Sequence, residues 1–418
     1  MKTYTTSEVF IPVGLPNITF VRRGNLERSV KAWEMNKAKH LLIFGPSKSG
    51  KTSLWKKNVP IETVIKIPCN SNKSIIEVYS EILFELNSFY TVEKQEELGL
   101  KSSFFAELTS LLGLFSAKVH AQSEVSTSSS DKQVSVTSPN IGVNLLIKYL
   151  KPSKKTIVLE DFHYSNDILK NQLSQDLKAF SDDECPWIIV GIQHKTSKLL
   201  SYNIDLQQRI AEIPVEGFTK EQLIEIIKLG ESALNINFSP EVKEIILEES
   251  IGSASLVQNI CQRICILNNI SQTLINQVEI SNPQVVYTAC KDIAYENKHY
   301  YEDVIKNIAL GGRSDGSTEK YKWFLKLIRD VDIPEHGLRN TEILNYLKEL
   351  GHKDIKQGSV TSGLSYLPRL LEKLDFPSFF DYESNSKTFY LLDKYIKFVF
   401  KWIPEMIDDL FEEDEINP

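Results

Sequence analysis

The sequence of 418 residues predicts an α/β protein in which a parallel β-sheet precedes an all-helical region and a C-terminal domain of helices and strands. Three observations support this prediction. Short apolar runs at 40–44, 157–159 and 188–192 lie far apart, which is typical of buried parallel strands joined by helices. Apolar residues at helical spacing follow between about 217 and 310. Further helical patterns and two short strand-like runs come near the end of the chain.

Composition and charge exclude several classes of protein. The chain carries 48 Lys and Arg against 55 Asp and Glu, a formal charge of −7, which argues against general nucleic-acid binding but leaves room for a local basic patch. Its five cysteines are dispersed and form no CxxC pair, so neither a disulfide framework nor a zinc site is indicated. The sequence has no apolar signal-peptide region at its start and no apolar run of roughly 18 residues, so we expect a cytoplasmic protein without a membrane partner.

A phosphate-binding loop, GPSKSGKT, follows the first apolar run directly. Its pattern, Gly45-x4-Gly50-Lys51-Thr52, fits the Walker A motif, in which glycines let successive backbone N–H groups turn towards phosphate oxygens. The N-terminus of the next helix attracts the same anion. We expect Lys51 to reach the β- and γ-phosphates of ATP and the Thr52 hydroxyl to bind Mg²⁺. The expected nucleotide-binding residues are Gly45, Pro46, Ser47, Lys48, Ser49, Gly50, Lys51 and Thr52.

An acidic pair ends the second apolar strand, as a phosphate-binding loop of this kind requires. In KKTIVLEDFHYS, Glu160 and Asp161 come directly after the strand. One carboxylate is expected to hold Mg²⁺ and the other to polarise the attacking water. The usual order, Asp and then Glu, is reversed here. By position Glu160 takes the metal role and Asp161 the role of the base, and the shorter Asp161 side chain predicts slow hydrolysis.

Two further polar positions are weaker candidates. Gln193 and His194 follow the strand at 188–192, at the edge where parallel sheets bind ligands, and could sense the γ-phosphate; the alternative is a loop without a role. Arg209 begins the strand-like run RIAEIPV and could act as an arginine finger in a neighbouring subunit. Its alternative is a surface arginine in a salt bridge.

The region from 217 to 310 is expected to form a helical lid. Thr219 with Gln222, and Ser239 before Pro240, are helix-start patterns. Cys261 and Cys265 lie on an apolar helical stripe, which indicates core residues and not metal ligands. A single long helix is expected after Pro283 up to about residue 310, followed by a flexible joint at 311–318.

Residues 318–402 fit a winged helix-turn-helix domain. Its third helix is expected to carry a stripe of apolar residues and to contain Pro368, and two strands joined by SNS would form the wing. The basic surplus is only about three residues, and the exposed helix face is interrupted by Glu372. Contact with protein is therefore favoured over DNA binding, and both remain open. The expected residues of that face are Thr361, Ser365, Tyr366, Arg369 and Lys373.

Two segments stand outside these domains. Residues 115–140 are serine-rich and would form either a protruding hairpin or a disordered loop. Residues 403–418 are strongly acidic and are expected to be a solvated terminus.

The order of these motifs resembles that of the AAA+ and STAND group of P-loop ATPases, especially single-chain ATPases of the initiator type that end in a winged helix. FVRRGNLERSVKAW is similar to the lead-in that closes over the adenine, with Arg22 or Arg23 carrying the match. EDFHYS is similar to the extended Walker B of bacterial defence-associated ATPases, which implies a place in antiviral defence. One departure is Ser255, which stands where the group has a sensor arginine, and this favours a switch over a motor.

The sequence therefore predicts an AAA+-like P-loop NTPase core at 1–216, a lid at 217–310, a winged helix at 318–402 and an acidic tail at 403–418. The expected function is an ATP- and Mg²⁺-dependent molecular switch that couples ATP or ADP to self-association or to another protein chain, the effector. The alternative is a DNA-binding ATPase of the replication-initiator or transposition-regulator type.

Overall fold

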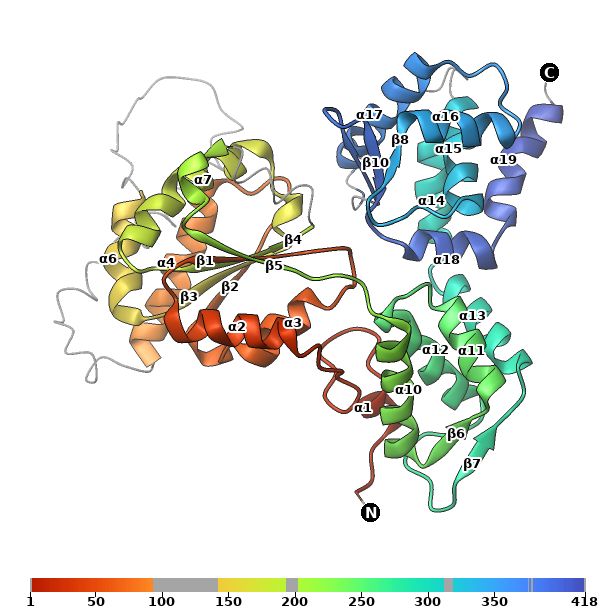
Figure 1. Ribbon diagram of the computed structural model, residues 1–418, viewed down its shortest axis with the longest axis horizontal. Helices are drawn as coiled ribbons and strands as arrows, with labels where there is room; N and C mark the ends of the chain where they lie inside the picture. The colour runs from red at the N-terminus through yellow and green to blue at the C-terminus, as the bar shows by residue number, and fades with distance from the viewer. Residues whose placement is uncertain are drawn as a thin grey trace, which may run out of the picture. The chain divides into compact units, whose positions relative to one another are not determined.

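The computed structural model describes residues 2–92, 142–192, 202–311, 319–374, 376 and 379–416 (Figure 1). The chain divides into two compact units, which we treat separately. The sheet unit comprises residues 24–44 and 54–214, and the helical unit comprises residues 1–23, 45–53 and 215–418. The expected insertion at 115–140 lies outside the described residues.

A five-stranded parallel sheet forms the centre of the sheet unit. Its strand order is β2-β3-β4-β1-β5, and every neighbouring pair is parallel. All residues of β3 and β4 are buried, which explains why these strands are continuous apolar runs. The predicted α/β class with a parallel-sheet core is thereby confirmed. The strands are β1 (His40–Phe44), β2 (Val64–Pro68), β3 (Thr156–Glu160), β4 (Trp187–Gly191) and β5 (Ile210–Pro214).

Helices cover this sheet because each has an apolar stripe. Three of them, α4, α6 and α7, pack against one another and share a core with the strands, whereas α2 lies beside β5 (Figure 1). Asn166 caps α7 by accepting a hydrogen bond from the Leu169 N–H. The helices are α2 (Asn25–Asn36), α3 (Lys51–Asn58), α4 (Ile75–Val92), α6 (Val143–Ser153) and α7 (Asp167–Asp182), with 3₁₀ turns η1 (Ile61–Thr63), η3 (Phe162–Tyr164) and η4 (Ile204–Leu206).

The first part of the helical unit contains the helix starts that the sequence predicts. The capping box of Thr219 and Gln222 and the Ser239 cap are both present. The region is not purely helical, because β6 and β7 form a two-stranded parallel ribbon. The prediction of a single long helix is wrong, because two helices are present and they are separated at Glu296 and Asn297. Asn favours helix caps over helix interiors. The elements are α1 (Thr6–Val9), α10 (Lys220–Leu234), β6 (Ile236–Phe238), α11 (Pro240–Glu249), α12 (Ala254–Leu267), β7 (Val278–Ile280), α13 (Gln284–Tyr295) and α14 (Lys298–Ala309).

The C-terminal segment, residues 319–416, contains helices and a three-stranded antiparallel sheet of order β8-β10-β9. Its elements begin in the order helix, strand, two helices and two strands, and two further helices follow. Pro368 lies within α17. The elements are α15 (Glu319–Asp330), β8 (Leu338–Arg339), α16 (Asn340–Glu349), α17 (Gln357–Lys373), β9 (Phe380–Glu383), β10 (Thr388–Leu391), α18 (Tyr395–Trp402) and α19 (Glu405–Ile416).

The acidic tail differs from its expectation as a solvated terminus, because most of it forms α19. Ile407 is fully buried, and Asp408 pairs with Arg329 at 2.6 Å. Apolar residues recur along this acidic stretch at helical spacing, so one face packs while the acids lie outside.

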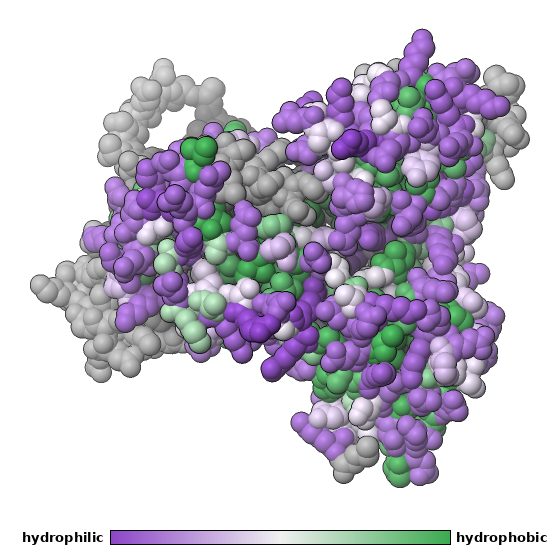
Figure 2. Space-filling view, viewed as in Figure 1, coloured by the Kyte–Doolittle hydropathy of each residue, from purple (hydrophilic) through white to green (hydrophobic). Residues whose placement is uncertain are grey.

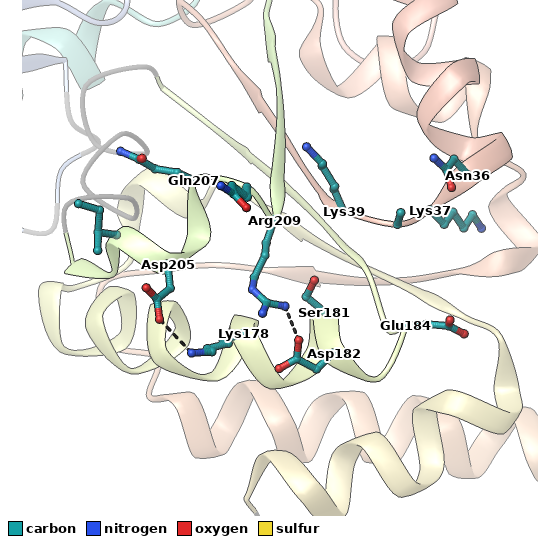
Figure 3. Close-up of a pocket in the computed structure, with 13 residues that line it drawn as sticks. Asn36, Lys37, Lys39, Lys178, Ser181, Asp182, Glu184, Asp205, Gln207 and Arg209 are labelled. Atoms are coloured by element: carbon teal, nitrogen blue, oxygen red, sulfur yellow. Dashed lines mark hydrogen bonds and ion pairs between the residues drawn. The ribbon is translucent and has the colours of Figure 1, made fainter.

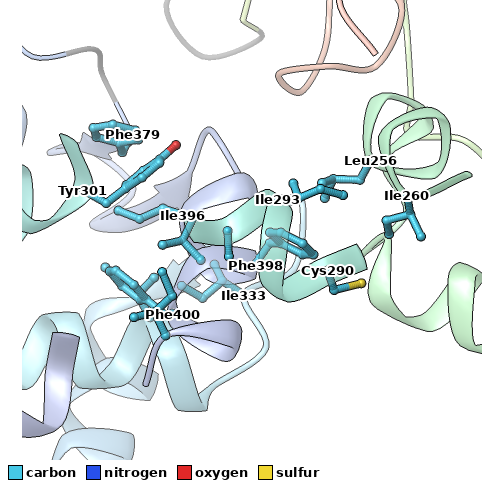
Figure 4. Packing of buried hydrophobic residues seen from close by; sticks show 14 of the residues in the cluster. Leu256, Ile260, Cys290, Ile293, Tyr301, Ile333, Phe379, Ile396, Phe398 and Phe400 are labelled. Atoms are coloured by element: carbon cyan, nitrogen blue, oxygen red, sulfur yellow. The ribbon is translucent and has the colours of Figure 1, made fainter. Parts of the chain in front are cut away.

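One hydrophobic core runs through the helical unit from the lid helices into the C-terminal segment. Figure 4 shows Cys290 and Ile293 of α13 close to Ile396 and Phe398 of α18. Cys261 and Cys265 are fully buried in this core, as their stripe predicted, and all five cysteines are free thiols. Because α13 and α18 share a core, the lid and the C-terminal segment are mechanically connected.

The surface is mainly polar on the face that Figure 2 shows, with small apolar areas between hydrophilic side chains. Among the helices of the described residues, none combines the length and the apolar character that crossing a bilayer requires.

Candidate nucleotide site

The phosphate-binding loop leaves the carboxyl end of β1 and turns into α3 at Lys51. Gly50 has φ +88° and Lys48 has φ +59°, so the backbone turns twice through the left-handed region. Gly45 is required for a different reason: a Cβ atom there would lie 1.9 Å from the Val215 carbonyl oxygen. These conformations produce the compact loop that the Walker A pattern predicts.

Polar groups inside this loop fit a phosphate. The Lys51 ammonium group donates to the carbonyl oxygens of Gly45, at 3.0 Å, and Pro46. Ser49 Oγ is buried and has no hydrogen-bond partner among the described residues. A lysine beside the loop, a buried hydroxyl and the N-terminus of α3 together form a donor set suited to a nucleotide's phosphates.

Arg23, and not Arg22, contacts the loop. The Arg23 guanidinium donates to the Ser49 carbonyl and, at 2.8 Å, to the Glu216 carbonyl. It also lies 3.7 Å from the centre of the Phe218 ring. Arg22 is exposed. Of the two arginines that the sequence left open, Arg23 therefore joins the loop to the start of the lid.

The loop also contacts the C-terminal segment. The Ser47 N–H donates to the Leu392 carbonyl at 3.3 Å. Lys48 Nζ lies 3.4 Å from an Asp393 carboxylate oxygen and 4.2 Å from the centre of the Tyr395 ring. This contact cannot be predicted from the sequence, since nothing in either local pattern indicates a partner so far along the chain.

Glu160 and Asp161 differ in their surroundings. Glu160 ends β3 and is only 5% exposed, and its carboxylate accepts a hydrogen bond from the Trp55 indole N–H. Asp161 is exposed, has φ +55° and begins the 3₁₀ turn η3. β3 and β1 are parallel with β4 between them, so Glu160 ends at the sheet edge from which the phosphate-binding loop departs.

Magnesium fits the chemistry of these groups. Mg²⁺ prefers oxygen ligands and is usually held by one or two protein oxygens together with phosphates and water. Thr52 and Glu160 supply a hydroxyl and a carboxylate of this type. The described part of the chain contains no cluster of three or more His, Cys, Asp or Glu side chains suited to a metal.

Arg209 lies away from this edge. It directly precedes β5, at the amino end of the strand, and its guanidinium pairs with Asp182 at the end of α7. Arg209 lines a pocket of about 1180 Å³, and Lys178 and Asp205, which also line it, pair at 2.9 Å. Figure 3 shows these side chains and both ion pairs. Since the amino ends of parallel strands are opposite the nucleotide edge, Arg209 is not placed to serve the phosphate-binding loop of its own sheet.

The other polar residues that the sequence singled out, where the structure describes them, are not seen to contact the phosphate-binding loop. Gln193 and His194 lie outside the described residues. Ser255, at the position of the missing sensor arginine, donates to the Pro12 carbonyl at 2.7 Å. Arg263, two turns further on, pairs with Glu296, so it is held on the surface of the lid.

Comparisons with known proteins support the fold. The sequence matches no protein-family model and no curated protein. The structure is similar to the Walker-type ATPase PABY2304 of Pyrococcus abyssi, with 16% identity and a TM-score of 0.52, over 92% of this chain and 100% of that chain. It is also similar to the Aeropyrum pernix ORC2 protein in ADPNP–ADP complexes, with 14% identity and a TM-score of 0.50, over 98% of each chain. These likenesses show the fold of a P-loop AAA+ ATPase.

Proposed function

We propose that this chain is an ATP-binding and ATP-hydrolysing switch in which the nucleotide controls the contact between the phosphate-binding loop and the C-terminal segment. The observation that carries the proposal is the triple contact of the loop with Leu392, Asp393 and Tyr395. We call residues 392–395 the loop-contact turn.

Phosphate and the loop-contact turn compete for the same groups. A Walker A loop holds phosphate through its backbone N–H groups and nearby cations. Here the Ser47 N–H is used by the Leu392 carbonyl, and Lys48 is used by Asp393 and Tyr395. A bound nucleotide therefore weakens the contact, and the contact weakens nucleotide binding, because such coupling is reciprocal.

The chain's own residues have distinct roles in hydrolysis. Lys51 neutralises phosphate charge, and Thr52 and Glu160 hold Mg²⁺, which supplies Lewis-acid stabilisation of the phosphoryl oxygens when bound. The exposed Asp161 orients the attacking water. Arg209 acts in trans, since it lies at the opposite edge of its own sheet.

Release of the loop-contact turn is the output of the switch. Leu392 and Tyr395 belong to a segment whose core continues into the lid, so their movement changes the surface that the helical unit presents. That surface is proposed to bind another protein chain or a second copy, in the manner of a STAND-type defence ATPase in the cytoplasm.

Nucleotide affinity tests this proposal. Lys51→Ala removes the charge-assisted phosphate contacts and is expected to abolish binding of a fluorescent ATP analogue. Asp393→Asn removes the charge facing Lys48 but keeps the oxygen that accepts the Tyr395 N–H. Exposed ion pairs are worth about 0–1 kcal/mol, so nucleotide is expected to bind up to about fivefold tighter.

The control is Asp332→Asn, which removes a carboxylate from a pair with Lys397 elsewhere in the C-terminal segment. Its nucleotide affinity is expected to equal that of the wild type. If Asp393→Asn behaves like Asp332→Asn, the coupling is absent and only nucleotide binding remains. If Lys51→Ala binds ATP normally, the assignment of the nucleotide site to this loop is wrong.

A second candidate is a DNA-binding AAA+ ATPase of the replication-initiator type. The likeness of the fold to the ORC2 protein favours it. It differs from the switch in requiring a basic DNA-binding face on the C-terminal segment.

A further inference from the structure

Trp55 makes an unusual polar contact for a core tryptophan. Its side chain is fully buried in the sheet unit, and its indole N–H donates to Glu160 Oε1. Burial alone does not require this bond, because Trp187 is equally buried and its indole nitrogen has no partner among the described residues. Glu160 is itself 5% exposed, so the bond is shielded from water.

Trp55 lies in α3, the same helix that carries Lys51 and Thr52 of the Walker A motif. Trp55 follows Thr52 by three residues and Lys51 by four in one continuous helix. Residues at these spacings lie on the same face of a helix. The indole therefore joins the acid that ends β3 to the face of the helix that also carries the two Walker A side chains.

We infer that Trp55 is a positioning residue for Mg²⁺, which holds the Glu160 carboxylate in the orientation that binds the metal. This inference rests on the proposed function. The indole N–H is a donor only and does not titrate at ordinary pH, so it fixes one carboxylate oxygen under all working conditions. Partners that orient a metal-binding carboxylate in this way typically change metal affinity 10–100-fold when removed.

The test compares two Trp→Phe variants in nucleotide binding over a Mg²⁺ series. Trp55→Phe keeps the aromatic ring and removes the N–H donor to Glu160. Trp187→Phe is the matched control, since it removes a buried indole N–H that donates to no described residue. We expect Trp55→Phe to need about tenfold more Mg²⁺ for half of the Mg²⁺-dependent gain in ADP affinity, while ADP binding in EDTA is unchanged. Trp187→Phe should match the wild type in both.

Three outcomes are distinguishable. A raised Mg²⁺ requirement in Trp55→Phe alone supports the inference. Equal requirements in the two variants overturn it while leaving the proposed function intact. A wild type whose nucleotide binding does not respond to Mg²⁺ overturns the proposed metal role and the inference together.

A second measurement covers the case in which Trp55→Phe fails to fold. The chain has five tryptophans, and labelling their indole nitrogens with ¹⁵N gives separate N–H resonances in the wild type. We expect one resonance to shift both on addition of Mg²⁺ with ADP and on Glu160→Gln. If no resonance responds to both changes, Trp55 does not act through Glu160.

Discussion

Glu160 and Asp161 are adjacent in sequence but differ in burial, and this difference decides their proposed roles. Glu160 is buried and bonded to Trp55, whereas Asp161 is exposed at a left-handed turn. Asp161→Asn should therefore bind ATP normally and lose hydrolysis, since it removes the group that orients water. Glu160→Gln should weaken Mg²⁺-dependent binding by removing the charge that faces the metal. Nucleotide affinity and phosphate release, measured with and without Mg²⁺, check both variants.

The isosteric amides serve as controls for each other, because both keep side-chain volume and remove one charge. If the two phenotypes are exchanged, each role follows the type of residue and not its position, so that Asp161 holds Mg²⁺ and Glu160 polarises the water. Equal loss of Mg²⁺-dependent binding in both would instead mean that the two acids share the metal.

At the residue scale, sequence reasoning succeeded where the chemistry is local. Gly50 and Lys51 act through the backbone turn they form themselves, so a short pattern predicts their conformation. Trp55 and Asp393 act through partners far along the chain, in Glu160 and Lys48, and these contacts exist only once the fold brings them together. No short pattern encodes such a pair.

At the scale of elements, His40 joins two strands and a helix of the sheet unit. Its ring Nε2 bonds the Leu177 carbonyl at 2.7 Å, and its Nδ1 accepts the Trp187 backbone N–H at 3.0 Å. Both bonds together require a neutral ring that donates at Nε2 and accepts at Nδ1. Burial lowers the pKa of His40 to about 4 from its ordinary value of 6.5.

This lowered pKa predicts acid sensitivity. Between about pH 6.5 and 4 the unfolded chain binds a proton at His40 and the folded chain does not, so stability falls as the pH decreases through this window. The full effect is on the order of 3 kcal/mol, since each unit of pKa shift corresponds to about 1.36 kcal/mol. Urea unfolding from pH 7.5 to 5 should show this loss, and His40→Gln should flatten it. His299→Gln, at an exposed site, should leave the loss unchanged.

A prediction about Arg209, also at the scale of elements, tests whether the chain associates with a second copy of itself. Arg209 directly precedes β5 at the amino edge of the sheet and pairs with Asp182. If it serves a neighbour's nucleotide, a mixture of Arg209→Ala and Asp161→Asn proteins should regain part of the ATPase activity that each lacks alone. Asp182→Asn is the control, because it breaks the pair but keeps the arginine. Normal hydrolysis by Arg209→Ala alone would show that the ion pair is the residue's whole role.

Among the elements, the long and buried ones were predictable and the short ones were not. β3 and β4 were evident as apolar runs, because both of their faces are buried. β8 has two residues and β6 three, and runs of that length carry no periodicity. They form because neighbouring strands supply their hydrogen bonds.

At the scale of the whole molecule, charge and packing bear on the choice between the proposed switch and the DNA-binding alternative. The chain carries a net charge of −7, and the core of the lid continues into the C-terminal segment. Of the face expected to meet DNA, Thr361 bonds Asn340 and Tyr366 packs against Tyr321, whereas Arg369 and Lys373 are exposed. Both basic residues of that face are therefore available, whereas two of its expected polar residues are engaged within the protein.

Duplex binding over a salt series distinguishes the switch from the initiator-type ATPase. Each phosphate contact contributes roughly 0.9 to the slope of log affinity against log salt, so two exposed cations predict a shallow slope. Under the switch hypothesis, a random duplex binds at non-specific levels of about 10⁻⁴–10⁻⁶ M with ATP present, and Arg369→Ala/Lys373→Ala changes this little. The control is Lys220→Ala/Lys243→Ala, which removes two lysines from the lid. Nanomolar binding at physiological salt that the α17 double variant loses and the lid double variant keeps would support the DNA-binding ATPase instead, because the affinity would then depend on the cations of α17.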